Sequence, residues 1–532
     1  MCYLSVTQVP IRRLQFCSLA ALFAAGCGSP APVAPVPDAS DATAVEGSSG
    51  SSESGIVGDS TMSGSDDSMP SADDSTTPFD GGTPVEASDA PYDGPITGSI
   101  SNPCSLPGSV VRTMSGVTTV PGGKTPSGGA LPDVSYIDVP VGFCVHYFAN
   151  VGNARQIRFA PGGEAFVASP TGGTTSGGQN GLNAIVVLPD DDNDGVADKT
   201  ITFLNKSALP GMALAYTQGM LFNGGYFYYQ DGNPLAMPPV STIRRIPYAP
   251  GQRAPSGPSE LVVDIGAYHH QDGLHWVKAL DVADDGTIYV GNGGSQTDSC
   301  VQPPWPFLGG ILKLDGTPGG SIVARGLRNP NAVRCSRGHD LCFALELAKD
   351  YSGPNSVSTP SQAGREKLIA IHQGDDWGFP CCATQGVPYA DPPYAVDCSG
   401  IAPVDDSFLI GDTPFGLDFE SGLWPGMWAG RVFIANHGAA GTWTGARLVA
   451  IAMDPTTGLP LPGTNYTYTG TAPTPDGGAY GDMGNLVDFA TGWDNAGNGH
   501  GRPTAVSFSP DGRLFLTNDT TGDIVWIAPA SL

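Results

Sequence analysis

From about residue 137 onward, the chain repeats one pattern of hydrophobic and polar positions. Each copy consists of a short alternating run, a turn that contains glycine, and a second run rich in β-branched and aromatic residues. Alternation with period two on both sides of Asp-Gly or Gly-Gly predicts a β-hairpin. The copies lie at residues 156–168, 220–228, 279–290, 332–343, 417–435 and 505–516, the second shorter and the fifth longer than the others.

Hairpins repeated at intervals of tens of residues predict radial repetition, so we expect an all-β fold, a six-bladed β-propeller. The segments between the hairpins would supply the outer strands of each blade and the loops. The composition agrees with this fold, because 74 glycines and 49 prolines make a turn-rich chain and argue against a helical bundle. We expect the propeller to occupy residues 104–532.

Residues 1–26 have the pattern of a secretory signal. Arg12 and Arg13 precede a short apolar run that ends in small residues, and this run is too short to span a membrane. Cys27, directly after Ala-Ala-Gly, resembles the lipid-bearing cysteine of bacterial lipoprotein signals; an ordinary signal peptide with an incidental cysteine is the alternative. The resemblance implies a membrane-anchored lipoprotein in the periplasm or at the cell surface, with the outer membrane as the expected membrane.

Residues 27–103 are rich in Ser, Asp, Gly and Pro and have almost nothing to bury. Such a segment cannot offset the entropy of ordering, so we expect a disordered tether. Thirteen acidic residues between Asp38 and Asp93 supply about half of the net charge of −27, and no Lys or Arg occurs between Arg13 and Arg112. The acidity therefore belongs mainly to the tether. The negative net charge disfavours nucleic acid, so we expect no nucleic-acid partner, because phosphate binding needs clustered basic residues.

The cysteines beyond the signal indicate disulfides. Eight remain, an even number in an exported domain, where oxidation is expected. Cys335 and Cys342 flank a predicted hairpin loop, so a bridge between them is the best single pairing. The spacing of Cys381, Cys382 and Cys398 does not suit a tetrahedral zinc site.

Polar residues recur at one position of the repeat. Asn153, His275, Arg328 and Arg502 stand ten or eleven residues before the hairpin glycine, and Gln218 takes the analogous place in the short copy. The first strand of each propeller blade lines the central axis, so these side chains should converge at one mouth of the channel. Two arginines, an imidazole and amides around one cavity suit a polar, anionic, planar ligand; each residue alone could instead have a structural role.

At these residues the sequence resembles the soluble quinoprotein glucose and sorbosone dehydrogenases, six-bladed propellers that use pyrroloquinoline quinone (PQQ). The resemblance covers nearly all of residues 139–529, and the sorbosone-type branch looks closer than the glucose branch. The most specific segments are Ala154–Phe159, Asp190–Asp198, His275 ahead of Asp284–Tyr289, Ala324–Pro330, Asp376–Pro380, Arg431–His437 and Gly501–Pro503.

The resemblance assigns roles to individual residues. It makes His275 the general base that takes the proton of a substrate hydroxyl while hydride passes to the quinone. Arg328 and Asn329 would hold the carboxylates and quinone oxygens of the cofactor, with Arg502 and Gln218 as further contacts. His437 lies where the glucose enzymes have a cofactor-binding lysine. The implied activity is oxidation of an aldose or sugar aldehyde, with electrons passed to an external acceptor.

One departure from the family concerns its catalytic calcium. Where the family has a glycine-containing loop that binds the ion, this chain has residues 344–350, Ala-Leu-Glu-Leu-Ala-Lys-Asp, without glycine. This motivates an alternative, a non-catalytic propeller that serves as a binding module on the cell surface. A calcium-dependent lactonase on a similar propeller is a third possibility.

A second calcium site is predicted at residues 190–198. Asp190, Asp192, Asp194 and Asp198 are spaced as in calcium loops, with Gly195 after the third. Ile201 stands where an EF-hand has its bidentate glutamate, so this is not a complete EF-hand loop. The sequence leaves two interpretations, a structural calcium or a solvated acidic turn.

Overall fold

The computed structural model describes residues 100–171, 180–206, 214–233, 240–265, 275–293, 300, 309–317, 319–347, 366–388, 395–408, 413–438, 446–461, 486–493 and 499–532. The signal, the predicted lipidation site Cys27 and almost all of the tether lie outside these residues, and stay predictions. In the described part of the chain, no helix is long and apolar enough to cross a membrane.

The described residues form the six-bladed β-propeller that the repeat predicts, and each blade is an antiparallel sheet. The first blade contains β4 (Gln156–Phe159), β5 (Ala165–Ser169), β6 (Ala184–Leu188) and β7 (Ile201–Asn205). The second contains β8 (Met220–Asn223), β9 (Tyr226–Asn233), β10 (Val240–Pro247) and β11 (Glu260–Asp264). The third contains β12 (Leu280–Val282), β13 (Ile288–Asn292), β14 (Gly310–Leu314) and β15 (Ser321–Arg325).

The fourth blade contains β16 (Asn329–Ser336), β17 (Leu341–Leu347), β18 (Glu366–Ala370) and β21 (Asp406–Phe408), with β19 (Cys382–Thr384) and β20 (Val387–Pro388) as a separate hairpin. The fifth contains β22 (Pro414–Phe419), β23 (Arg431–Asn436), β24 (Arg447–Ala452) and β25 (Leu486–Ala490). The sixth contains β26 (Pro503–Phe508), β27 (Leu514–Asn518), β28 (Asp523–Pro529) and β3 (Phe143–Asn150), extended by β1 (Val110–Thr113) and β2 (Gly116–Thr119). Short 3₁₀ turns lie at Pro103–Ser105 and Gly426–Trp428.

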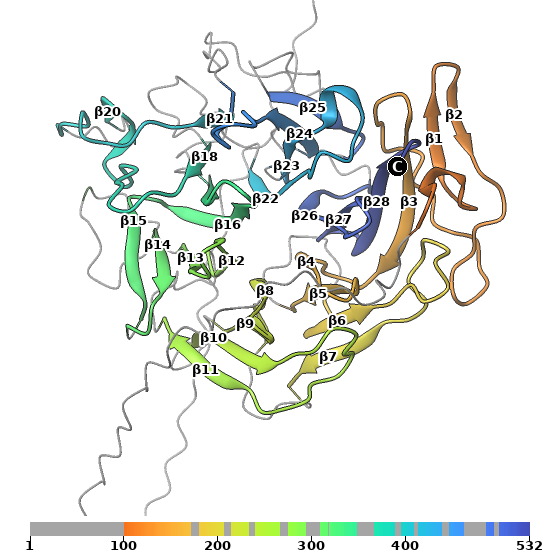
Figure 1. Cartoon of the computed structure of the whole chain (residues 1–532), viewed down its shortest axis with the longest axis horizontal. Coiled ribbons are helices and arrows are strands. Elements are labelled where there is room, and N and C mark those ends of the chain that lie inside the picture. Colours follow the sequence, from red (N-terminus) through yellow and green to blue (C-terminus); the bar gives the residue numbers. More distant parts are fainter. Residues whose placement is uncertain are drawn as a thin grey trace, which may run out of the picture. The chain divides into compact units, whose positions relative to one another are not determined.

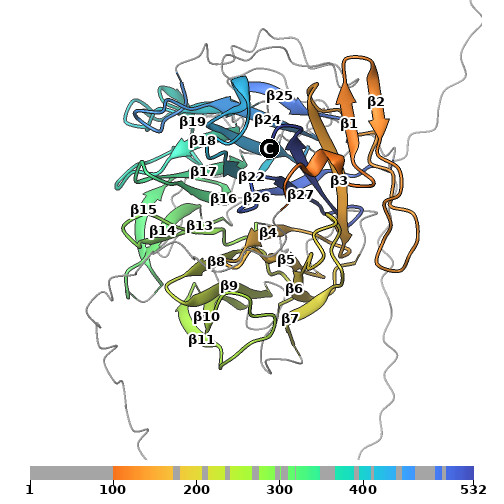
Figure 2. The ribbon, with the colours of Figure 1, turned by 45° about the vertical axis from the view of Figure 1, so that its right-hand side comes forward.

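Every predicted hairpin forms the two inner strands of one blade. The inner strands β4, β8, β12, β16, β22 and β26 surround the middle of the molecule in Figure 1, and each contacts its neighbours around the ring. The ring closes in the sixth blade, where β3 pairs antiparallel with the last strand, β28. Figure 2, turned by 45° from Figure 1, shows β3 beside the C-terminal strands of this blade. Pairing β3, which precedes the first hairpin in the chain, with the last strand removes the open ends that a linear array of blades would leave.

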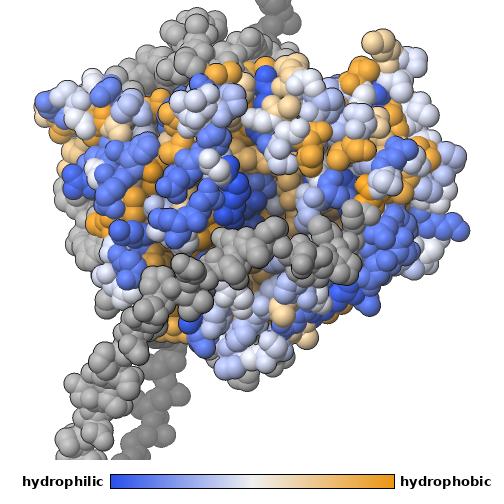
Figure 3. Space-filling model, in the orientation of Figure 1, coloured by the Kyte–Doolittle hydropathy of each residue, from blue (hydrophilic) through white to orange (hydrophobic). Residues whose placement is uncertain are grey.

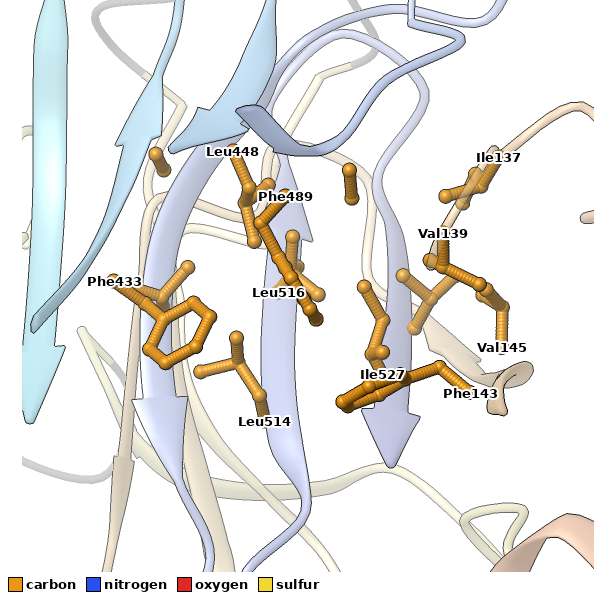
Figure 4. Packing of buried hydrophobic residues seen from close by; sticks show 14 of the residues in the cluster. Ile137, Val139, Phe143, Val145, Phe433, Leu448, Phe489, Leu514, Leu516 and Ile527 are labelled. Carbon is orange, nitrogen blue, oxygen red and sulfur yellow. The ribbon is translucent and has the colours of Figure 1, made fainter. Parts of the chain in front are cut away.

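The hydrophobic core consists of packed faces between blades. Among the described residues it divides into six apolar clusters, one between each pair of neighbouring blades. Successive residues of one strand serve different clusters: Phe166 packs toward the second blade, and Val167 packs toward the sixth. The strands are therefore buried on both sides, and β5 and β6 have no exposed residue. Figure 4 shows the cluster between the fifth and sixth blades, where Phe433 and Phe489 face Leu514 and Leu516.

Four disulfides join the eight cysteines of the domain. The predicted bridge between Cys335 and Cys342 is confirmed, and it crosses from β16 to β17. The other pairs are Cys104–Cys144, Cys300–Cys381 and Cys382–Cys398. The bridge from Cys104 attaches the segment before the first hairpin to β3, the strand that closes the ring.

Loop length should rank these bridges by their effect on stability. Cys104 and Cys144 are 40 residues apart, and Cys335 and Cys342 are seven apart. Because a cross-link that closes a longer loop removes more entropy from the unfolded chain, replacing the first pair with alanines should cost about 1.5 kcal/mol more than replacing the second. Urea unfolding of the two double variants measures the difference. Equal losses, or a larger loss for the hairpin bridge, would contradict the loop-length argument.

Candidate functional site

The polar positions predicted from the repeat lie at one end of the propeller axis. Asn153, Gln218, His275 and Arg328 directly or closely precede the inner strands of the first four blades, and Arg502 directly precedes β26. Since the second strand of each blade runs antiparallel to the first, the ends of β13, β17, β23 and β27 reach the same mouth. Figure 3 shows hydrophilic residues gathered around a hollow near the middle of one face of the molecule.

Arg155 shows that four blades meet at this mouth. Arg155 directly precedes β4 of the first blade. Its guanidinium group forms a buried ion pair with Asp519, which follows β27 of the sixth blade. The same group lies 5.5 Å from the ring centroid of Trp276, in the third blade, and 5.1 Å from that of Phe415, in the fifth. A side chain that touches residues of the third, fifth and sixth blades lies at the axis. Trp276 directly follows His275, so the same contact brings the predicted base close to the axis.

Asp519 also binds His437. The Nε2 atom of His437 is 3.0 Å from Oδ2 of Asp519, and the imidazole stacks on Phe415 with ring centroids 4.5 Å apart. Arg502 joins this group, because its guanidinium donates a hydrogen bond of 2.9 Å to the carbonyl oxygen of Gly438. The sequence-predicted residues His437 and Arg502 are thus brought together, on a carboxylate that the sequence analysis had not selected.

Burial and charge set the protonation of this group. Burial lowers the pKa of His437 to about 4, although the neighbouring Asp519 raises it, so the imidazole is neutral at neutral pH. Burial raises the pKa of Asp519, but His437, Arg155 and Arg502 outweigh this effect and hold it below its ordinary value. Two guanidinium groups therefore face one carboxylate and a neutral imidazole, and the excess positive charge suits an anion.

Buried amides at the mouth have unused hydrogen-bonding atoms. Gln218 is 1% exposed, and within the described residues neither its Oε1 nor its Nε2 has a partner. Oδ1 of Asn329 and both side-chain atoms of Asn436, next to His437, are in the same situation. A glycine is required at 293, because a Cβ there would lie 2.2 Å from Oδ1 of Asn329. Unsatisfied buried polar atoms are costly, so they indicate a site that a polar ligand completes.

Arg328 is fixed through the fourth blade. Its backbone NH donates to Oε1 of Glu346 at 2.9 Å, and the other carboxylate oxygen of Glu346 accepts a bond of 2.7 Å from Lys367. Both members of this ion pair are fully buried. The part of the 344–350 segment up to Leu347 belongs to β17, and its remaining residues lie outside the described part.

The remaining predicted residues at this end of the propeller are His275 and Asn153. His275 is half-buried and has φ of 55°, a left-handed conformation at the start of the third blade's inner segment. Asn153 is buried, and its amide donates to the carbonyl of Pro170 at 2.9 Å. This bond fixes the chain at the start of β4, which favours the structural interpretation of Asn153.

The acidic segment forms a turn outside the axis. Carboxylate oxygens of Asp190, Asp192 and Asp194 all lie within 4.8 Å of one another, as the calcium spacing predicts. Asp198 does not belong to that group; its Oδ2 accepts a bond of 2.6 Å from the backbone NH of Asp191 and closes the turn. A structural calcium bound by the three carboxylates stays a prediction.

Sequence reasoning missed Arg155 and Asp519. Arg155 lies beside Asn153, inside one of the segments that carry the family resemblance, and Asp519 directly follows the second strand of the last hairpin. Counting back from the hairpin glycine selects only residues ahead of the first strands. The antiparallel pairing, which brings the ends of the second strands to the same mouth, was the signal that could have found them.

The axial site is the name used below for the polar residues at this mouth. Its members are Arg155, Gln218, His275, Arg328, Asn329, His437, Arg502 and Asp519.

No protein-family model matches the sequence, and no curated protein is similar to it. Solved structures share its fold. An AA12 carbohydrate-active enzyme from Trichoderma reesei, in an iodide structure, superimposes with a TM-score of 0.56 at 18% identity, over 75% of this chain and 100% of that one. The PQQ domain of pyranose dehydrogenase from Coprinopsis cinerea, in its holo form, gives 0.53 at 15% identity, over 74% and 96%. At these identities the likeness shows the fold alone.

Proposed function

We propose that this protein is a PQQ-dependent oxidoreductase that oxidises an aldose or a sugar aldehyde. The observation that carries the proposal is the axial site itself, where two guanidinium groups, a neutral imidazole and buried amides with unused polar atoms meet at one mouth. Such a donor set fits a planar ligand with several carboxylate and carbonyl oxygens, which PQQ is. The PQQ domain of a pyranose dehydrogenase has the same fold, which further supports the proposal.

Individual residues of the axial site would have different roles in binding the cofactor. Arg328 and Arg502 would bind carboxylates of the cofactor, and the amides of Gln218 and Asn329 would satisfy its carbonyl oxygens and ring nitrogens. Asp519 would hold His437 and Arg155 in place beneath the ligand. The calcium that the family resemblance implies would be bound at the same mouth, and the sorbosone-type branch of that family is the one we favour.

The chemistry of the proposed reaction needs a base. Oxidation of a C–OH group removes a hydride from carbon and a proton from oxygen, and bound PQQ supplies the acceptor for the hydride. His275 would take the proton, since a neutral imidazole accepts one near neutral pH. The two electrons would then leave to an external acceptor. The lipid anchor at Cys27 and the tether would hold the domain near an outer membrane, in reach of sugars outside the cytoplasm.

A titration of the mature chain with PQQ in the presence of calcium tests the proposal. We expect a saturable change in the absorption spectrum at one PQQ per chain, followed by reduction of a redox dye that depends on added sugar. A chain that produces no spectral change with PQQ refutes the proposal. Sugar binding without PQQ binding would instead support the non-catalytic binding module.

A further inference from the structure

Lys278 is a buried lysine that the proposed roles do not use. It lies three residues after His275 and two before β12, and its side chain is fully buried. Among the described residues, its Nζ atom has two hydrogen-bond partners, the carbonyl oxygens of Gly293 at 3.4 Å and Val277 at 3.5 Å. In the described part of the chain, no carboxylate forms an ion pair with it. Removing an ammonium group from water without a counter-ion is very costly, so this arrangement needs an explanation.

Lys367, the second fully buried lysine among the described residues, has the carboxylate partner that Lys278 lacks there. Lys367 is also without exposed surface, but its Nζ lies 2.7 Å from Oε2 of Glu346, which is equally buried. That pair follows the general rule that buried charges are paired. Within the part of the chain that the structure describes, Lys367 thus has a carboxylate as its counter-ion, whereas Lys278 has carbonyl oxygens as its partners.

Lys278 lies between residues of the axial site. Its backbone touches the second blade next to Gln218, since a Cβ on Gly219 would lie 1.9 Å from the carbonyl oxygen of Lys278. Its Nζ binds the carbonyl of Gly293, and the unpartnered Oδ1 of Asn329 lies against the Cα of that same glycine. The backbone of Lys278 therefore lies next to Gln218, and its amine lies beside Gly293, against which the Oδ1 atom of Asn329 packs.

The elements packed around this amine carry several titratable groups. On β12 itself, Asp281 forms an ion pair of 3.5 Å with Arg334 of β16. His275 precedes it on the same segment, Arg328 lies beside Asn329, and Asp231 on the second blade accepts a bond from the backbone NH of Leu214. Glu346 is bound to Lys367. Burial lowers the pKa of Lys278 to about 7, and no neighbouring charge contributes to this shift. Near neutral pH, both the ammonium form and the neutral amine are therefore populated, as burial without a counter-ion favours the neutral form of a lysine.

We propose that Lys278 is a further ligand-binding residue of the axial site: its ammonium form supplies the counter-charge for an anionic ligand, and it takes up a proton when that ligand binds. The inference rests on the proposed function, which makes PQQ the anion. An anion in the site would replace the missing carboxylate, and would explain why the amine is buried with carbonyl partners rather than paired as Lys367 is.

Proton uptake on PQQ binding is the direct test. At pH 8 the amine of the ligand-free protein would be mostly neutral, so binding of PQQ should take up nearly one proton; at pH 6 the uptake through Lys278 should be small. Calorimetry in two buffers of different ionisation enthalpy measures this number. The variant Lys278→Met should lose the uptake, and should bind PQQ 10- to 100-fold more weakly at pH 6, the loss expected for a charge-assisted bond. Lys278→Arg, which stays charged, should bind PQQ without the uptake.

Stability separates this role from a structural one. Because the pKa of Lys278 is lower in the folded than in the unfolded chain, the unfolded state binds more protons between about pH 7 and 10.5, and the wild-type protein gains stability as pH rises through this window. Lys278→Met lacks this dependence. It should be at least as stable as the wild type, with the largest advantage below pH 7, whereas a structural lysine would leave it destabilised. Lys313→Met, in the same blade, is the control.

The outcomes distinguish this inference from the proposed function. If the wild-type protein does not bind PQQ, the proposed function fails, and the role of Lys278 fails with it. If the wild type binds PQQ and Lys278→Met binds it equally well, or takes up as many protons, only the inference about Lys278 is overturned.

Discussion

Replacing His275 with asparagine should reduce sugar-dependent dye reduction by the PQQ-loaded protein by about 10²- to 10⁴-fold, the contribution typical of a general base. Trp276, the next residue, contacts the axial Arg155, so His275 lies near the mouth. In the proposed reaction, its removal leaves the substrate hydroxyl without a proton acceptor. Asparagine is the suitable replacement, because residue 275 has φ of 55° and asparagine tolerates the left-handed conformation better than alanine. Steady-state rates at saturating sugar measure the effect.

The His275→Asn variant should still bind PQQ with the spectral change of the wild type, because its loss concerns proton transfer and not the cofactor. His372→Asn, at an exposed position outside the axial site, is the matched control and should leave the rate unchanged. A His275→Asn protein that binds PQQ and turns over sugar at the wild-type rate would show that another group is the base.

Replacing Asp519 with asparagine should lower the free energy of unfolding at pH 7 by about 3–5 kcal/mol, the cost of leaving a buried charge without its partner. Asp519 is fully buried between Arg155 and His437, and its neighbours hold its pKa below the ordinary value. The ionised carboxylate therefore stabilises the folded state above its unfolded pKa of about 3.9, and this contribution is lost as pH falls below that value. Urea unfolding at pH 7 and at pH 3.5 should show the difference between variant and wild type shrinking in acid.

A double-mutant cycle assigns the loss to the ion pair. Arg155→Met in the Asp519→Asn background removes the guanidinium that would otherwise remain buried without a counter-ion, so the double variant should be more stable than Asp519→Asn alone. If the two losses simply add, Arg155 and Asp519 contribute independently, and the ion pair at the axis is not what stabilises the mouth.

The repeat predicted the fold because hairpin formation is a local property. The turn glycine and the alternating runs at residues 156–168 or 505–516 specify two strands of one blade without reference to the rest of the chain. Alternation of hydrophobic and polar residues is typical of a strand with one buried and one exposed face. The strands β5 and β6 are instead buried on both faces, because each blade packs between two others. The same local reasoning gave Cys335–Cys342, whose cysteines face each other across one hairpin.

The sequence by itself determined the hairpins, their number, the one bridge within a hairpin, and the strand ends at which chemistry could lie. Only the tertiary structure decided that Arg155 meets Asp519, which is 364 residues away, and that β3 closes the ring against β28. It alone decided that Lys367 pairs with a carboxylate and that the described partners of Lys278 are carbonyl oxygens. The physical reason is that turn and strand preferences act between neighbours in the chain, whereas burial and the pairing of charges depend on which distant segments the closed ring brings together.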